Sequence, residues 1–96
     1  MRVLVVEDDK NLREQLASAL GDAGYTVDTA DNGEDGQFQG ETEPYDIAIL
    51  DLGLPKIDGL TVLKAWRKAG RDLPVLILSA RDRWSEKVEG LDLGAN

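Results

Sequence analysis

The amino-acid sequence predicts an α/β fold, a doubly wound parallel sheet with helices on both of its faces. Short apolar runs alternate regularly with segments whose apolar residues recur at helical spacing. The runs are continuous, without alternating polar residues, which is typical of strands buried on both faces of a parallel sheet. The chain has 96 residues, so we expect one small domain.

The first strand is expected at residues 3–6, where four β-branched or aliphatic residues precede a run of acids. A helix over residues 11–23 is expected next, because apolar residues recur there at helical spacing: Leu12, Leu16, Ala19, Leu20 and Ala23. Asn11 and Glu14 have the spacing of a capping box at its start, and Gly24 is suited to its end.

The second strand, expected at residues 25–29, is weaker in apolar content than the first. Residues 34–40 stand where the next helix is expected, but their sequence has low helix propensity. Gly36 and Gly40 each cost about 1 kcal/mol relative to alanine in a helix, and Phe38 alone is large and apolar there. We therefore expect this helix to be short or frayed.

The remaining elements are clearly indicated by apolar runs and by the residues that bound them. A third strand is expected at residues 45–50, after Pro44, and a helix from residue 60 to just before Gly70. Residues 73–78 are almost purely apolar and predict a fourth strand. A polar helix is expected over residues 82–91.

Composition excludes several classes of chemistry. The sequence contains neither cysteine nor histidine, which removes disulfide scaffolds, Cys/His zinc sites and Ser-His or Cys-His nucleophile pairs. No apolar run approaches the roughly 18 residues of a membrane span, and the amino terminus lacks the apolar core of an export signal. We expect a cytoplasmic protein without a membrane partner.

The charge is negative and unevenly distributed. The net charge is −8, and residues 1–50 hold 12 acidic and 3 basic residues. Such a domain repels a nucleic-acid backbone, so direct DNA binding by residues 1–96 is not expected. Acids concentrated in one half indicate a cation site or a basic partner, although most of those in residues 22–46 are read as solvated surface.

Polar residues follow three of the predicted strands at their carboxyl ends, where ligands bind in open parallel sheets. Glu7 and Asp8 follow the first strand, Asp51 the third and Ser79 the fourth. If the first and third strands are neighbours, the acids meet and repel one another unless a proton or a divalent cation intervenes. Oxygen ligands without histidine or cysteine suit Mg²⁺.

Asp51 beside a metal ion has the chemistry to attack a phosphoryl donor and form an aspartyl phosphate, with Ser79 donating a hydrogen bond to a phosphoryl oxygen. The simpler interpretations are that Asp8 or Asp9 only caps the following helix, that Asp51 is a turn residue and that Ser79 is a cap. Placement of the acids and the hydroxyl at one sheet edge favours the functional interpretation.

Several motifs together resemble the receiver domain of bacterial response regulators. The resemblance spans the whole chain and is carried by Val-Leu-Val-Val-Glu-Asp-Asp at 3–9, Asp-Ile-Ala-Ile-Leu-Asp-Leu-Gly-Leu-Pro at 46–55, Asp-Gly-Leu at 58–60 and Leu-Pro-Val-Leu-Ile-Leu-Ser-Ala-Arg at 73–81. Residues 51–55 with Arg81, Trp84, 87–89 and 94–95 look most like the OmpR group, particularly its PhoP-like members.

The resemblance implies a role for each site residue. Asp51 would be the phospho-acceptor, supplied by a sensor histidine kinase. Asp8 and Asp51 would bind Mg²⁺ through their side chains and Gly53 through its backbone carbonyl, while Glu7 would act mostly through bound water. Ser79 would be the switch hydroxyl that moves to the phosphoryl group.

The resemblance also implies the wider organisation. The strand order would be 2-1-3-4-5, with a fifth strand and helix beyond Asn96, so residues 1–96 would be a receiver domain incomplete at its carboxyl terminus. A winged-helix DNA-binding domain would follow, outside this chain, and the phosphorylated full-length protein would form a homodimer. The domain would be a regulator of transcription and not an enzyme, catalysing at most its own phosphorylation and dephosphorylation.

Three alternatives to this signalling role would each require different residues. In a phosphohydrolase resembling the haloacid dehalogenase group, a second aspartate would stand at position 53, where this chain has Gly53. A flavodoxin-like binder would carry a phosphate-binding loop after the first strand, where acids stand instead. A pseudo-receiver that only contacts proteins would not need the acid pair and Asp51.

Without a fifth strand, residues 73–78 would form the edge of the sheet. Residues 75–78 are apolar and carry no charge, and the unpaired peptide groups of such an edge are a template for pairing with another chain. We therefore expect the isolated 96-residue chain to self-associate.

Overall fold

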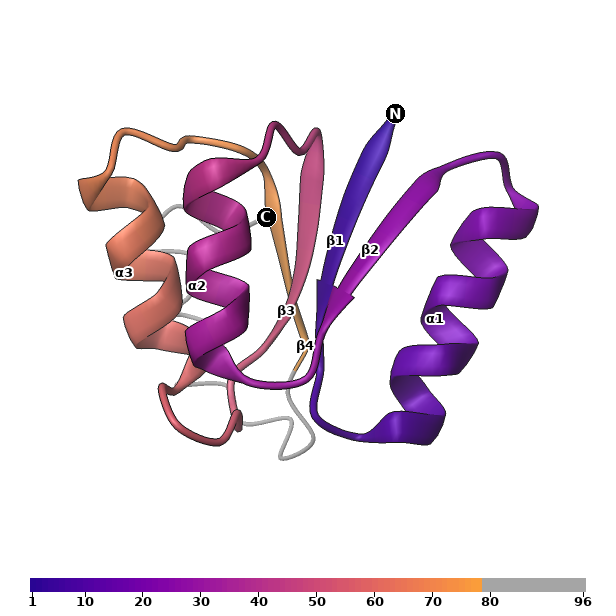
Figure 1. Ribbon diagram of the computed structural model, residues 1–96, viewed down its shortest axis with the longest axis horizontal. Helices are drawn as coiled ribbons and strands as arrows, with labels where there is room; N and C mark the ends of the chain where they lie inside the picture. Colours follow the sequence, from indigo (N-terminus) through magenta and orange to yellow (C-terminus); the bar gives the residue numbers. More distant parts are fainter. Residues whose placement is uncertain (79–96) are drawn as a thin grey trace.

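The computed structural model describes residues 1–78, which form a parallel sheet with helices on both faces (Figure 1). The elements in chain order are β1 (Arg2–Val6), α1 (Lys10–Asp22), β2 (Thr26–Ala30), α2 (Gly33–Thr42), β3 (Ile47–Asp51), α3 (Gly59–Lys68) and β4 (Val75–Leu78). The strand order is β2-β1-β3-β4 with every pair parallel, which confirms the predicted order for these strands. The helix predicted over residues 82–91 lies outside the described part.

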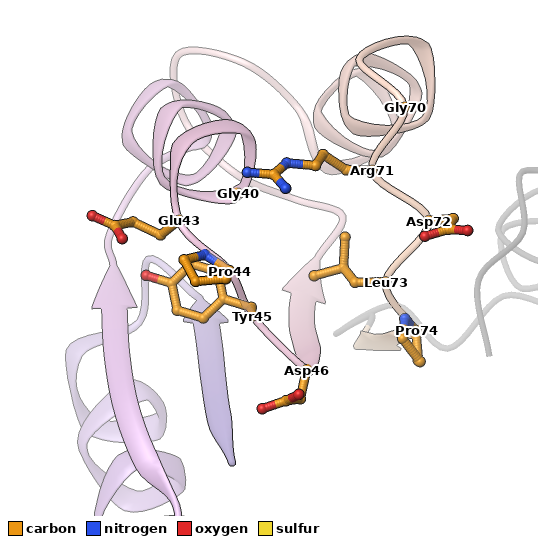
Figure 2. A pocket seen from close by; sticks show the side chains of 10 residues that line it. All are labelled: Gly40, Glu43, Pro44, Tyr45, Asp46, Gly70, Arg71, Asp72, Leu73 and Pro74. Carbon is orange, nitrogen blue, oxygen red and sulfur yellow. The ribbon is translucent and has the colours of Figure 1, made fainter.

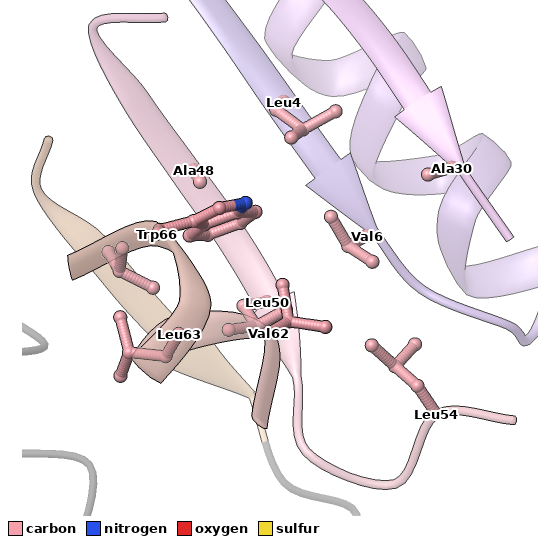
Figure 3. Close-up of a cluster of buried hydrophobic side chains, with 10 residues drawn as sticks. Leu4, Val6, Ala30, Ala48, Leu50, Leu54, Val62, Leu63 and Trp66 are labelled. Atoms are coloured by element: carbon pink, nitrogen blue, oxygen red, sulfur yellow. The ribbon is translucent and has the colours of Figure 1, made fainter. Parts of the chain in front are cut away.

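The sheet separates two hydrophobic clusters because successive side chains of a strand point to opposite faces. Leu4 and Val6 of β1 pack with Val62, Leu63 and Trp66 of α3 in the larger cluster (Figure 3). The smaller cluster lies under α1 and contains three buried residues: Val3, Val5 and Ile49. In Figure 1, α2 and α3 cover one face and α1 covers the other. Both faces of the central strands are thus buried, as their continuous apolar sequences predict.

Helix α1 begins two residues earlier than the predicted capping box requires. Asp9 has an extended backbone, and its Oδ1 accepts a hydrogen bond from the Leu12 amide at 3.2 Å. Asp9 is therefore the N-cap, and the predicted capping box of Asn11 and Glu14 is wrong. The cap interpretation weighed for Asp9 is confirmed.

Helix α2 is a complete helix of 10 residues, so the expectation of a short or frayed helix is wrong. Its glycines are buried and allow close packing. A Cβ atom added at Gly36 would lie 2.6 Å from Cγ1 of Val6, and one added at Gly40 would collide with the indole of Trp66. The Trp66 indole N–H also donates to the Gln37 carbonyl at 3.2 Å. Tertiary packing against Trp66 thus outweighs the low helix propensity of glycine.

Strands β2 and β4 are the edges of the sheet within residues 1–78. Leu76 of β4 is 45% exposed. Strand β4 begins after Pro74, which has no N–H to donate but whose carbonyl accepts from the Ala48 amide at 3.0 Å. The edge position of this strand agrees with the sequence analysis, while self-association stays a prediction.

No helix within residues 1–78 is long and apolar enough to cross a bilayer.

Candidate functional site

Three carboxylates meet at the carboxyl ends of β1 and β3. Glu7 and Asp8 directly follow β1, and Asp51 is the last residue of β3. The two strands are adjacent, with Val6 opposite Leu50 in the register. One oxygen from each acid lies within 4.8 Å of the others. The structure therefore brings together the three acids that the sequence analysis singled out.

Backbone amides fix the two buried carboxylates of this acid cluster. Glu7 and Asp51 are only 4% and 7% exposed, whereas Asp8 is open to solvent. The Asp9 amide donates to Oε2 of Glu7, and the Gly53 amide donates to Oδ1 of Asp51, each at 3.1 Å. These bonds orient the side chains but leave most of their acceptor capacity unused.

The environment of Glu7 disfavours its charged form. Burial is the main cause that raises the pKa of Glu7 to about 7. Hydrogen bonding with Asp51 and Asp8 and repulsion by Asp51 contribute to the increase, and the Asp9 amide opposes it. Within residues 1–78, none of the three acids forms an ion pair with a basic side chain. The cluster is thus short of positive charge.

The loop after β3 is held close to Asp51 by a residue without a side chain. A Cβ atom on Gly59 would collide with the Asp51 carbonyl and lie 2.7 Å from Cα of Leu52. The Gly59 amide donates to the Leu52 carbonyl at 3.1 Å. Asp58 caps α3 by accepting from the Thr61 amide at 3.0 Å, and this bond holds the pKa of Asp58 below its usual value. The pair of Asp58 and Gly59 therefore allows α3 to begin in close contact with the backbone at the end of β3.

Gly53 and Ser79 differ in how far the structure describes them. Gly53 is exposed and lies two residues after Asp51, which its amide contacts, and the metal role of its carbonyl stays a prediction. Ser79 lies outside the described residues, so its predicted role as switch hydroxyl also stays a prediction.

Arg13 belongs to this site and was missed by the sequence analysis. Its Nη1 donates to the Glu7 carbonyl at 3.0 Å and approaches the Asp8 carbonyl at 3.4 Å. The available signal was its place in the first turn of the helix that follows the acid pair, from which a long side chain can reach back.

A second concavity lies at the opposite end of the sheet. The ten residues labelled in Figure 2 line a pocket of about 400 Å³ at the carboxyl ends of α2 and α3. The guanidinium of Arg71 in this pocket donates to the Glu41 carbonyl at 2.9 and 3.2 Å. The Arg71 side chain therefore connects the segment after α3 to α2. We place the candidate functional site at the acid cluster and not in this pocket.

The donor set fits a hard divalent cation. Clustered carboxylate oxygens without nitrogen or sulfur ligands favour Mg²⁺ over zinc or copper. A cation at this point would offset both the burial cost of the charged Glu7 side chain and its repulsion by Asp51, which together raise the pKa of Glu7. It would also leave Asp51 with oxygen lone pairs for nucleophilic attack.

Comparison with known proteins assigns a family to this arrangement. Residues 3–96 match the response regulator receiver domain. The chain is 48% identical over 96 residues to the transcriptional regulatory protein DltR of Streptococcus agalactiae. It is 46% identical over the same length to the transcriptional regulatory protein PhoP of Escherichia coli. The alignments cover 100% of this chain but 43% of each relative, so the chain spans less than half their length.

A solved structure supports the fold assignment. The response regulator TrrA from Thermotoga maritima, in complex with Mg²⁺-BeF, superposes with a TM-score of 0.87 and 36% identity. The match covers 99% of this chain and 81% of that one. The resemblance to receiver domains stated from the motifs is confirmed.

Proposed function

The chain belongs to the family of response regulator receiver domains, and from that premise we propose that Asp51 accepts a phosphoryl group from a sensor histidine kinase. The observation that carries the proposal is the cluster of Glu7, Asp8 and Asp51, which has no basic partner within residues 1–78. Family membership disfavours the phosphohydrolase and flavodoxin-like alternatives. A pseudo-receiver remains the alternative that experiment must separate.

The proposed reaction transfers a phosphoryl group from nitrogen to oxygen. A carboxylate oxygen of Asp51 attacks the phosphorus, the bond from phosphorus to the kinase imidazole breaks, and its electron pair returns to the imidazole nitrogen. The Gly53 amide, 3.1 Å from Oδ1, holds the Asp51 carboxylate in one orientation during the attack. Orientation of this kind lowers the entropic part of the barrier.

The metal set proposed for Mg²⁺ consists of Asp8 and Asp51 through their side chains, the Gly53 carbonyl, and Glu7 through water. When bound, Mg²⁺ offsets negative charge on the phosphoryl oxygens. A bound cation would favour the ionised form of the Glu7 side chain, which burial disfavours. Ser79 is proposed to donate its hydroxyl to a phosphoryl oxygen.

The role of the whole protein is proposed from its relatives, which are named as transcriptional regulators. Phosphorylation of Asp51 would shift a two-state equilibrium of the receiver and so control DNA binding by a winged-helix domain outside this chain. A homodimer of the phosphorylated protein and a cytoplasmic location belong to the same proposal. The receiver itself would act on no other substrate, and at most would catalyse its own phosphorylation and dephosphorylation.

The direct test is to incubate the purified chain with acetyl phosphate, with and without Mg²⁺, and to locate the modified residue by mass spectrometry. We expect a Mg²⁺-dependent acyl phosphate on Asp51 and none in the Asp51→Asn variant. Asp28→Asn, which removes a carboxylate of β2 that is bonded to Arg2 and Tyr45 and lies outside the acid cluster, is the matched control and should be modified as the wild type is. Modification of Asp51→Asn to the wild-type extent, or no modification of the wild type, would exclude the proposal.

A further inference from the structure

We propose that Arg13 is a positioning residue for the metal site, and that its guanidinium holds the peptide groups of Glu7 and Asp8 so that both carboxylates face Asp51. The inference rests on the proposed function, because it concerns the same cation site. It assigns Arg13 no contact with the cation or the phosphoryl group.

Arg13 bonds three successive carbonyls of the turn between β1 and α1. Its Nη1 donates to the Glu7 carbonyl at 3.0 Å and lies 3.4 Å from the Asp8 carbonyl. Its backbone amide donates to the Asp9 carbonyl at 2.8 Å, which is the first bond of the helix. One residue in the first turn of α1 therefore fixes the whole turn that carries the acid pair.

These carbonyls lie where the sheet no longer supplies partners. Strand β1 ends at Val6, and the Glu7 amide makes a last bond to the Ala30 carbonyl at 3.0 Å. Glu7 is buried, and an unpaired carbonyl at a buried position is costly, so the Glu7 carbonyl needs a donor from outside the sheet. The Asp9 amide holds the Glu7 carboxylate from one side, and the guanidinium holds the Glu7 carbonyl from the other. Loss of the guanidinium would free this peptide group to rotate and carry the carboxylate with it.

Two explanations of the role of Arg13, its charge and its positioning of the turn, predict opposite effects of its removal on cation binding. Within residues 1–78 the Arg13 guanidinium forms no ion pair, so its positive charge stands near the acid cluster without neutralising any one acid. If charge alone mattered, removing it would strengthen the binding of a cation by relieving repulsion. If the guanidinium positions the turn, removing it weakens cation binding. The sign of the change therefore separates the two explanations.

The experiment is a calorimetric titration of the purified chain with Mg²⁺. We expect Arg13→Gln to raise the Mg²⁺ dissociation constant about tenfold or more, the range typical of outer partners of metal ligands. Arg13→Lys keeps the charge but replaces the planar guanidinium, whose Nη1 reaches both carbonyls, with a shorter ammonium, and should give a smaller loss. Lys10→Gln, which removes a charge from the exposed first residue of α1, is the charge control and should not weaken binding.

One further measurement makes the outcome decisive. Thermal unfolding in chelator shows which variants are folded, and affinities are compared only among these, so that a general loss of stability is not counted as a loss of metal binding. Wild-type or tighter Mg²⁺ binding in a folded Arg13→Gln or Arg13→Lys variant overturns the inference. If Arg13→Gln does not fold, Arg13→Lys decides alone.

Failure of this inference is distinguishable from failure of the proposed function. A wild-type chain that binds no Mg²⁺ overturns both. A wild-type chain that binds Mg²⁺ and loses binding in Asp8→Asn, while Arg13→Gln binds normally, overturns only the role of Arg13.

Discussion

Carboxylates at the two ends of the sheet are stabilised in opposite ways. At the amino end, Asp28 accepts from the Tyr45 hydroxyl at 2.7 Å and from Nη2 of Arg2 at 2.8 Å. These bonds, led by that of Tyr45, hold the pKa of Asp28 below its usual value. At the carboxyl end, burial and neighbouring acids raise the pKa of Glu7 to about 7. The negative charge of Asp28 is thus stabilised by hydrogen bonds within the protein, whereas that of Glu7 needs a proton or a cation.

The same strand contributes to both ends. Strand β1 begins with Arg2, whose guanidinium also lies 5.0 Å from the centre of the Tyr45 ring, and Glu7 follows its last residue. Asp28 pairs with Leu4, three residues before Glu7, so at about 3.3 Å per residue the backbones that carry the two carboxylates are roughly 10 Å apart along the strands. Charges at this distance are largely screened where they are open to solvent. Substitutions at one end should therefore leave the other end unaffected, and this independence can be tested.

The largest effect is expected from Asp51→Asn. This change removes one metal charge at similar volume, so Mg²⁺ should raise the melting temperature of the wild type and scarcely that of the variant. Without Mg²⁺ the variant should be as stable as the wild type or more stable, because repulsion within the acid cluster falls. Melting curves over a series of Mg²⁺ concentrations measure both effects. Equal Mg²⁺ responses in the two proteins would argue against a metal site at Asp51.

An intermediate effect is expected from pH, through Glu7. The folded protein holds the Glu7 proton up to a pH of about 7, whereas the unfolded chain releases it near 4.5. The folded state therefore binds more protons between these values, and the contribution of Glu7 to stability is lost as pH rises through 7. Since each pKa unit corresponds to about 1.4 kcal/mol, the loss is at most about 3 kcal/mol.

Urea unfolding in chelator at pH 5 and pH 8 measures this loss. Glu7→Gln, which cannot ionise, should show a smaller decrease in stability between these pH values than the wild type. Saturating Mg²⁺ should also reduce the decrease in the wild type, because the cation takes the place of the proton. A decrease of the same size in Glu7→Gln would show that other groups cause it.

The smallest effect is expected from Asp28→Asn at the amino end. The variant loses an ion pair with Arg2 that is partly open to solvent and the charged acceptor of the Tyr45 hydroxyl, so unfolding should cost about 1 kcal/mol less at pH 7. The lowered pKa means that this stability is present above the pKa of the unfolded aspartate and is lost as pH falls through the folded value. Urea unfolding at pH 7 and pH 3 should show the difference between variant and wild type shrinking in acid. An unchanged Mg²⁺ affinity is the control for independence of the two ends.

The sequence predicted the acid cluster well because its logic is topological. Parallel neighbouring strands end at the same edge, so Glu7 and Asp51 had to meet once β1 and β3 were neighbours. The Arg2, Asp28 and Tyr45 contacts could not be predicted in this way. These residues are 17 to 43 positions apart and come from the middle of β2, the start of β1 and the segment before β3, so they meet only through the reach of their side chains.

Helix α2 shows where local propensity fails. Glycine is a poor helix former, and Gly36 and Gly40 indicated a frayed segment. The structure fills the space above Gly40 with Trp66, a residue of α3 that nothing in the local sequence of α2 reveals. Asp9 is a smaller case of the same kind. It stands next to the two acids predicted to bind a metal, and the sequence alone did not distinguish its role as the N-cap of α1 from theirs.

The central claim, that only the carboxyl-end cluster takes up a cation, is tested most directly by nuclear magnetic resonance with Mn²⁺ in place of Mg²⁺. Manganese occupies sites of the same oxygen chemistry and broadens the amide signals of nearby residues. We expect substoichiometric Mn²⁺ to broaden the signals of residues 7–9 and 51–53 first, and excess Mg²⁺ to restore them, while Asp28 and Tyr45, which lie farther from the cluster, are broadened later and less. Earlier or equal broadening at Asp28 and Tyr45, or no selective broadening at residues 7–9 and 51–53, would contradict the account.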